Sequence, residues 1–185
     1  MPDGTCSRGE VVAGPSLSIR PADHSDLEAL AAFSVATYVA AFGHSFRPSD
    51  LVAHLATSLS EARWRSYFDE DRILVAIEAG AIRGFVQFGA TGDPGVMELR
   101  RLYVDPKRFG EGVGSRLLQA ALADPILSDA ACLELDVWED NPGAARLYRR
   151  FGFVPAGRRA FRSPSGEVTG YDIIMRRYAE RPRGC

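Results

Sequence analysis

The sequence has few cysteines and no excess of charge of either sign. Its 185 residues include 3 cysteines, 22 Lys and Arg, and 24 Asp and Glu, for a formal net charge of −2. Cys6, Cys132 and Cys185 are odd in number and far apart, which argues against a disulfide framework and is typical of a reducing cytoplasm. We interpret Cys132, in an apolar run, as a small buried hydrophobe rather than a nucleophile. Without a basic excess we expect no nucleic-acid partner.

Long apolar runs and the signatures of several enzyme classes are also missing. No run approaches the length of a membrane span, and the first residues lack the apolar centre of a secretory signal, so no membrane partner is expected. There is no C-x-x-C, H-E-x-x-H, G-x-S-x-G or Walker loop with its lysine, and no metal is expected. The composition, 46% hydrophobic and 25% charged, is that of one globular domain with a sizeable core.

A glycine-rich stretch, residues 99–118 (LRRLYVDPKRFGEGVGSRLL), predicts a strand, a loop and the start of a helix. Gly110, Gly112 and Gly114 alternate just before apolar residues at helical spacing. Such glycines let several backbone N–H groups converge on one anion, and the helix N-terminus adds a partial positive charge. We therefore predict a phosphate cradle, for which a flexible turn is the alternative.

Two stretches resemble the motifs of the GCN5-related N-acetyltransferase (GNAT) superfamily. LYVDP…GEGVGSRLL is similar to motif A, whose loop pattern is Q/R-x-x-G-x-G/A, although Phe109 stands at the Q/R position and the basic Arg108 one place earlier. Residues 136–157 (DVWEDNPGAARLYRRFGFVPAG) resemble motif B, N-x-x-A-x-x-x-Y-x-x-x-G-F. The phrases VWEDN and TYVAAFG also resemble the PaiA-like polyamine acetyltransferase branch. The matching positions of motif B are Asn141, Ala144, Tyr148, Gly152 and Phe153.

The resemblance implies an α/β (α+β) GNAT fold with a mixed, mostly antiparallel seven-stranded sheet and helices on both faces. We expect a disordered tail over 1–16, one acetyltransferase domain over 17–178 and a polar tail over 179–185. The expected helices follow Asp23 or Ser25, begin at Pro48, and cover 61–68, 112–123 and 142–151, with Pro125 lying beyond the fourth. The expected strands are 17–20, 73–78, 82–88, 96–104, 131–137, 153–161 and 168–178.

In the GNAT fold the fourth and fifth strands are parallel but splay apart, and acetyl-CoA lies in the gap as the cosubstrate. The resemblance therefore implies a pantetheine arm along the fourth strand and a thioester carbonyl polarised by a backbone N–H near Leu102, Tyr103 or Val104. Motif B adds Asn141, Ala144 and Tyr148 to the cofactor-binding set, with helix capping as the alternative role of Asn141. The phosphate-binding residues would be Phe109, Gly110, Glu111, Gly112, Val113, Gly114 and Ser115.

Two residues are candidates for the proton transfers. Tyr148 can give its phenol proton to the departing thiolate, or it is a core aromatic beside Leu147. Glu98 can act as the base, directly or through water, or it forms a structural ion pair with Arg100, which would make it a weaker base. Further base candidates are Glu139, Asp140 and His44.

The expected acceptor is the primary amine of a small molecule. A peptide or protein amine is the alternative, and a non-catalytic CoA-binding regulatory module is a second. Asp69, Glu70 and Asp71 could hold a polycation such as a polyamine, although a solvated loop explains them as well. Arg100 and Arg101 favour an acceptor with a carboxylate, and strand alternation predicts that at most one of them points into the cleft. Monomer and homodimer are both left open.

Overall fold

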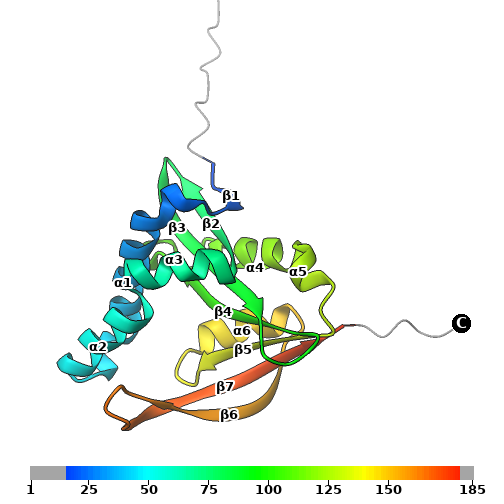
Figure 1. Cartoon of the computed structure of the whole chain (residues 1–185). Coiled ribbons are helices and arrows are strands. Elements are labelled where there is room, and N and C mark those ends of the chain that lie inside the picture. Colours follow the sequence, from blue (N-terminus) through cyan, green and yellow to red (C-terminus); the bar gives the residue numbers. More distant parts are fainter. Residues whose placement is uncertain (1–15, 180–185) are drawn as a thin grey trace, which may run out of the picture.

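The computed structural model describes residues 16–179, in which seven strands form one sheet (Figure 1). The two predicted tails, with Cys6 and Cys185, lie almost entirely outside the described residues. The strand order is β1-β2-β3-β4-β5-β7-β6, and only the β4–β5 pairing of this sheet is parallel. The predicted fold class is confirmed. The strands are β1 (Ser18–Pro21), β2 (Arg72–Glu78), β3 (Ala81–Ala90), β4 (Val96–Val104), β5 (Cys132–Trp138), β6 (Val154–Arg162) and β7 (Val168–Tyr178).

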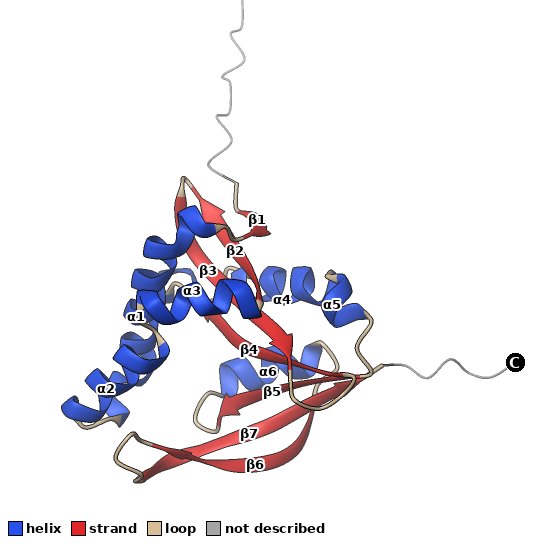
Figure 2. Ribbon diagram, in the orientation of Figure 1, coloured by secondary structure: helices blue, strands red, loops and turns tan. Residues whose placement is uncertain are grey.

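Helices cover both faces of the sheet (Figure 2). On one face Trp64 and Tyr67 of α3 and Leu30 of α1 pack against Val75 and Phe85 of the sheet. On the other face α4, α5 and α6 cover the larger core, which includes the fully buried Leu117 and Leu118 of α4. The helices are α1 (Leu27–Phe42), α2 (Pro48–Ser58), α3 (Glu61–Glu70), α4 (Val113–Ala123), α5 (Pro125–Ser128) and α6 (Pro142–Arg150).

Two helical expectations were incomplete. The third helix is a full α3 of 10 residues, because the Ser60 side chain accepts a hydrogen bond from the Arg63 N–H and caps it. Pro125 does not simply follow α4 but begins the short α5, since Asp124 caps the Ile126 N–H and proline suits the first helical position. Cys132 is buried and free, as expected.

One helical stretch has the length and hydropathy of a membrane span, which the sequence was not expected to contain. It covers His24–Ser45, and 33% of its most apolar segment of 18 residues is buried within the protein. Its buried residues include Leu27 and Leu30, which pack with Trp64 and Phe85 in the core between helices and sheet. A core helix passes the same test, so the packing explains the composition of this stretch.

β4 and β5 diverge after a short pairing. The parallel register joins Val96–Glu98 to Cys132–Glu134 and stops there, while β5 remains paired to β7 as far as Trp138. On its other edge β4 carries a bulge against β3, since Gln87 faces Arg101 but Phe88 faces Leu99. A bulge bends a strand and increases its twist. The splay implied by the GNAT resemblance is therefore present, and it leaves one edge of β4 open.

Candidate active site

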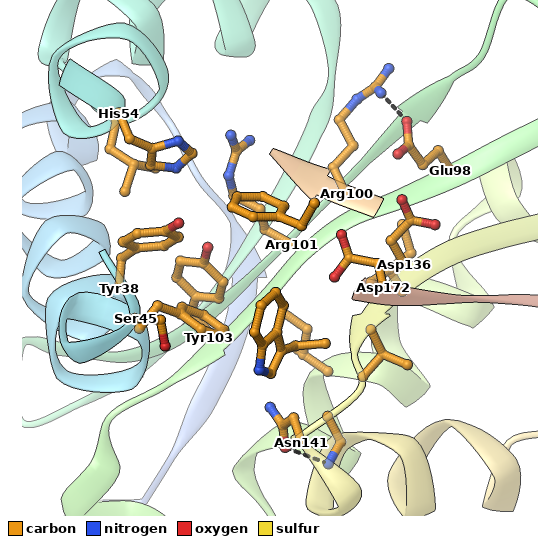
Figure 3. A pocket seen from close by; sticks show the side chains of 18 of the residues that line it. Tyr38, Ser45, His54, Glu98, Arg100, Arg101, Tyr103, Asp136, Asn141 and Asp172 are labelled. Carbon is orange, nitrogen blue, oxygen red and sulfur yellow. Dashed lines mark hydrogen bonds and ion pairs between the residues drawn. The ribbon is translucent and has the colours of Figure 1, made fainter. Parts of the chain in front are cut away.

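A cavity of about 540 Å³ lies at the splay between β4 and β5 (Figure 3). Asp136 and Asp172 stand together on one side, Tyr38 and His54 stand on the other, and Arg101 lies between them. The cavity combines aromatic rings with charged groups of both signs. Of the expected site residues, those that line it are Glu98, Leu102, Tyr103, Asn141, Ala144 and Tyr148.

The expected phosphate-binding residues, Phe109 to Ser115, lie outside the cavity lining, in the loop and first turn that lead into α4. Gly110 and Gly112 have φ values of +84° and +81°, a conformation that favours glycine, and a Cβ at either would have no heavy atom within 4 Å. α4 begins at Gly112 without a side-chain cap. The first N–H groups of a helix have no intrahelical partner. Open space at both glycines, next to the first N–H groups of α4, leaves room for a phosphate.

The start of α4 is held beside α6. A Cβ at Gly114 would lie 3.4 Å from Leu147 Cδ2 of α6, and Arg150 of α6 donates a hydrogen bond of 3.1 Å to the Ser115 hydroxyl. The departure from motif A is also visible, because Phe109 is 68% exposed. Arg108 does not replace the missing Q/R side chain at this position, since its guanidinium is paired with Glu78 and Glu111.

Tyr148 and Asn141 each have the structural role that was given as the alternative, and both also line the cavity. Tyr148 is buried against Phe153, with ring centroids 6.0 Å apart, and it also lines the cavity. Burial, with a smaller contribution from Tyr103, raises the pKa of Tyr148 far above its usual value, so the phenol keeps its proton. Asn141 caps α6 by accepting a 3.0 Å hydrogen bond from the Ala144 N–H, and it lines the cavity as well.

Glu98 forms an ion pair with Arg100, which was the alternative to its role as the base. Its Oε2 accepts a hydrogen bond from Arg100 Nη1. Arg100 also binds Asp71 at 3.0 Å through Nε and the Ala90 carbonyl at 2.7 Å through Nη2. Asp71 was expected with its neighbours in a solvated loop, but it is the C-cap of α3 and its side chain is only 1% exposed. The acidic run is therefore not free to hold a polycation.

The bulge also corrects the expectation for the two arginines. Because Arg100 is the extra residue of the bulge, strand alternation is interrupted and both Arg100 and Arg101 line the cavity. Arg101 donates to Gln87 Oε1 at 2.6 Å and to the Tyr67 hydroxyl at 3.0 Å. Gln87 is fully buried and donates in turn to Asp71 at 2.6 Å. One buried carboxylate thus positions both guanidinium groups.

Several cavity residues were not found from the sequence. His54 of α2 stacks on Tyr38, with centroids 4.7 Å apart, and burial lowers its pKa, so it is neutral near pH 7. The sequence candidate His44 does not line this cavity. Burial also raises the pKa of Asp136, and it raises that of Asp172 to about 6. Asp136 and Trp138 are two residues apart on β5 and therefore share a strand face. This alternation was the sequence signal that could have identified them as cavity residues.

On one side the cavity is bounded by Phe46, His54 and Phe161, where the segment 46–58 contacts the β6–β7 hairpin. The buried Asp50 of α2 accepts a 2.9 Å hydrogen bond from the Ser165 hydroxyl, and Arg47 forms a 2.8 Å ion pair with Glu167. Phe161 of β6 packs edge-on against Phe46 and His54. We call these contacts the roof. Within residues 16–179 no group of three His, Cys, Asp or Glu side chains is arranged to hold a metal ion.

A family model described as "Acetyltransferase (GNAT) family" matches residues 39–153. The chain belongs to the GNAT family. An uncharacterized N-acetyltransferase of Mycobacterium tuberculosis is 31% identical to this GNAT protein over 152 residues, which are 81% of this chain and 97% of the relative. A mycothiol acetyltransferase of Acidimicrobium ferrooxidans is 37% identical over 103 residues, 54% of this chain and 33% of that protein.

Solved structures of the family have the same fold. The PaiA N-acetyltransferase from Thermoplasma acidophilum, in complex with coenzyme A, matches with a TM-score of 0.69 at 20% identity, over 88% of this chain and 99% of that one. The ribosomal-protein-S18-alanine N-acetyltransferase from Escherichia coli matches with a TM-score of 0.65 at 20% identity, over 92% and 99%. Together with the family match, these relatives show that this GNAT protein is an acetyl-CoA-dependent N-acetyltransferase.

Proposed function

We propose that this GNAT enzyme transfers the acetyl group of acetyl-CoA to the primary amine of a small molecule, within the domain proposed over residues 17–178. The observation that carries the proposal is the cavity itself, which the aromatic residues of the roof, Phe46, His54 and Phe161, bound on one side. Asp50, Arg47 and Phe46 tie the α1–α2 region to the β6–β7 hairpin through Ser165, Glu167 and Phe161. A small amine fits a cavity of about 540 Å³, and we propose that the roof restricts the access of a protein segment to it.

The chain offers a residue for each step of the transfer. Acetyl-CoA supplies an activated acyl group, which the amine nitrogen attacks while the C–S bond breaks. We propose that the backbone of 109–115 holds the phosphates and that an N–H of Leu102, Tyr103 or Val104, on the open edge of β4, polarises the thioester carbonyl. Glu98 takes the proton that the amine loses, and Tyr148 gives its proton to the departing sulfur.

The two alternatives find less support. On this proposal the roof restricts a protein or peptide acceptor, and the likeness to the Escherichia coli enzyme that acetylates a ribosomal-protein alanine extends to the fold alone. A non-catalytic CoA-binding module is suggested by Phe109 at the Q/R position. However, that position is exposed and the backbone donors of the cradle do not depend on its side chain, while Tyr148 is retained in the cavity.

A polyamine acceptor also finds less support from the side chains. Of the three clustered acids, Asp71 is occupied by Arg100 and Gln87, and Glu70 is paired with Arg63. The likeness to PaiA is at 20% identity and extends to the fold. The relative from Acidimicrobium ferrooxidans is named for mycothiol rather than for a polyamine, and this chain covers only a third of it.

The proposal is tested by measuring CoA release with four acceptor groups: amino acids, simple amines, spermidine and short peptides. We expect release well above hydrolysis with members of the first two groups and none with peptides. Spermidine should be compared at low and high salt, because a polycation held by carboxylates loses affinity as salt rises. Acetylation of peptides alone would overturn the small-molecule acceptor, and no release with any amine would favour the non-catalytic module.

The roof offers a matched control. Asp50→Ala removes the hydrogen bond to Ser165 without touching β4 or the cradle. If the roof excludes peptides, this variant should acetylate them better than the native enzyme does, while its affinity for acetyl-CoA stays the same. Thr57→Ala, which removes an exposed hydroxyl on the same helix that bonds only to helical carbonyls, should show no gain with peptides.

A further inference from the structure

Most charged side chains that line the cavity already have a partner of opposite charge. Glu70 pairs with Arg63 at 3.3 Å, and Glu98 pairs with Arg100. Asp136 lies 3.2 Å from Arg159. Two charges remain. Within the part of the chain that the structure describes, neither Arg101 nor Asp172 forms an ion pair, although both line the cavity. One is a cation and the other an anion.

Arg101 is held in a fixed orientation by neutral groups. Arg101 Nη1 donates a hydrogen bond to Gln87, which itself donates to Asp71, and Arg101 Nη2 donates to the Tyr67 hydroxyl. The guanidinium also lies 4.7 Å from the Tyr67 ring centroid. A guanidinium carries five N–H donors, so these contacts leave donors for a ligand. A pre-oriented guanidinium without its own carboxylate is suited to bind one from outside.

Asp172 is the complementary group on the other side of the cavity (Figure 3). It lies on β7 opposite Trp138 of β5, beside Asp136. The charged groups that act on it are Asp136 and Glu139 from the β5 side and Arg159 from β6, and the two acids oppose the one base. A half-buried carboxylate in this setting gains from an incoming ammonium group.

We propose that the acceptor is a zwitterion, an amino acid with an apolar side chain, whose carboxylate binds Arg101 and whose ammonium group binds Asp172 before it loses its proton. This inference rests on the proposed small-molecule acetyl transfer and narrows its substrate class. The aromatic rings of Phe46, Trp138 and Phe161 supply the surface for the apolar side chain. A simple amine would leave Arg101 unpaired, and a polyamine would be repelled by it.

The pKa of the Tyr38 phenol is affected by both charges. Asp172 raises the pKa of Tyr38 and Arg101 lowers it, while burial is the main cause of its high value. Tyr38, Arg101 and Asp172 all line one cavity. Because burial keeps the proton on the Tyr38 phenol, this hydroxyl can donate a hydrogen bond to a ligand in the cavity.

The test compares three acceptors of one shape: L-phenylalanine, L-phenylalaninamide and 2-phenylethylamine, with the leucine series as a second set. CoA release should give L-phenylalanine a kcat/KM about ten-fold or more above that of 2-phenylethylamine, the effect of one charge-assisted pair. In Arg101→Gln this ratio should fall to about one, and Arg101→Lys should restore part of it. Arg63→Gln is the matched control, because its cation already has Glu70, and should keep the native ratio.

Asp172→Asn should raise KM for every amine in the series, because it weakens the hold on the ammonium group that all of them share. Equal kcat/KM for amino acid and amine in the native enzyme would overturn the inference. So would an Arg101→Gln variant that lowers all three acceptors by the same factor, since this is the effect of a purely structural role.

Calorimetric titration of the CoA-loaded protein with the same three compounds separates this inference from the proposed function. Tighter binding of L-phenylalanine than of 2-phenylethylamine, lost in Arg101→Gln, would support the zwitterion site even without turnover. Such binding with no CoA release would overturn the transfer to small molecules and leave the site standing. Release without any charge-dependent difference in binding would overturn the site alone.

Discussion

We propose that the two sides of the splay recognise their ligands by different means. On the cofactor side, the loop before α4 presents backbone N–H groups, and glycines at Gly110 and Gly112 keep the space in front of them open. On the acceptor side, side chains from α1, α2, α3 and four strands converge, and a buried Asp71 orients two arginines. Backbone recognition tolerates change in side chains but not in chain conformation, and side-chain recognition has the opposite sensitivity. The predictions below perturb the two sides in turn.

The largest effect is expected on the cofactor side. Gly112→Trp should weaken acetyl-CoA binding by about 100-fold or more, because the indole occupies the place of the anion and blocks several charge-assisted hydrogen bonds. Isothermal titration measures the change. Gly80→Trp is the control, since Gly80 has a similar φ of +76° and open space but lies in the β2–β3 turn. Unchanged affinity in Gly112→Trp would place the phosphates elsewhere.

The next largest effect is expected on kcat from a change at Tyr148, which we place between the cofactor side and the acceptor side. Tyr148→Phe should lower kcat by about 100-fold, the usual contribution of a general acid, while acetyl-CoA binding changes little. The hydroxyl matters only as the sulfur departs, and the ring continues to pack on Phe153. Single-turnover rates and a binding titration separate the two quantities. Full activity in this variant would reduce Tyr148 to a packing residue.

A smaller effect is expected on the acceptor side from Gly89→Ala. An added Cβ would overlap Asp71 Oδ1, so the carboxylate that orients Arg100 and Gln87 must move. We expect a loss of about 1–3 kcal/mol in the free energy of unfolding and a higher KM for the acceptor, with acetyl-CoA affinity retained. Gly92→Ala, with open space around it, is the control. A variant with native acceptor KM would show that Asp71 does not position the cavity arginines.

The smallest effect concerns stability and pH. Burial and the neighbouring Asp136 raise the pKa of Asp172 to about 6 from a usual 3.8. Between these two pH values the folded protein therefore keeps a proton on Asp172 that the unfolded chain has released. The contribution of this proton to the free energy of unfolding is complete below pH 4 and is lost as the pH rises through 6. Asp172→Asn avoids the loss and should be about 1 kcal/mol more stable than native at pH 8, after allowance for solvent screening, with no gain at pH 3.5. Urea unfolding at the two pH values measures this, and a gain at both would point to a cause other than ionisation.

The comparison explains why one side could be predicted and the other could not. The cradle depends on glycine at fixed spacing before a helix, which is a local pattern that the sequence displays. The roles expected for Glu98 and Tyr148 followed from motif position, and both residues do line the cavity. By contrast, His44 was considered as a base although His54 lines the cavity, because nothing local distinguishes two histidines on adjacent segments.

The two arginines show the limit most clearly. Period-two alternation placed Arg100 and Arg101 on opposite faces, which is correct for a regular strand. A bulge in β4 turns both toward the cavity, and a bulge depends on how β4 pairs with β3 rather than on either strand alone. Likewise Asp71 looks like one of three solvated acids until the folded sheet brings Gln87 and Arg100 against it.

Local patterns in the sequence indicate the family, nearly all of the order of strands and helices, and the loop that we propose to hold the phosphates of acetyl-CoA, because hydrophobic period, capping residues and glycine spacing act over a few neighbouring residues. The tertiary structure decided which charges are paired and which are free. The lack of an ion-pair partner for Arg101 and Asp172 in the described residues depends on groups that lie far away in the chain. Electrostatic and packing energies depend on distance in space, and only the folded chain sets those distances.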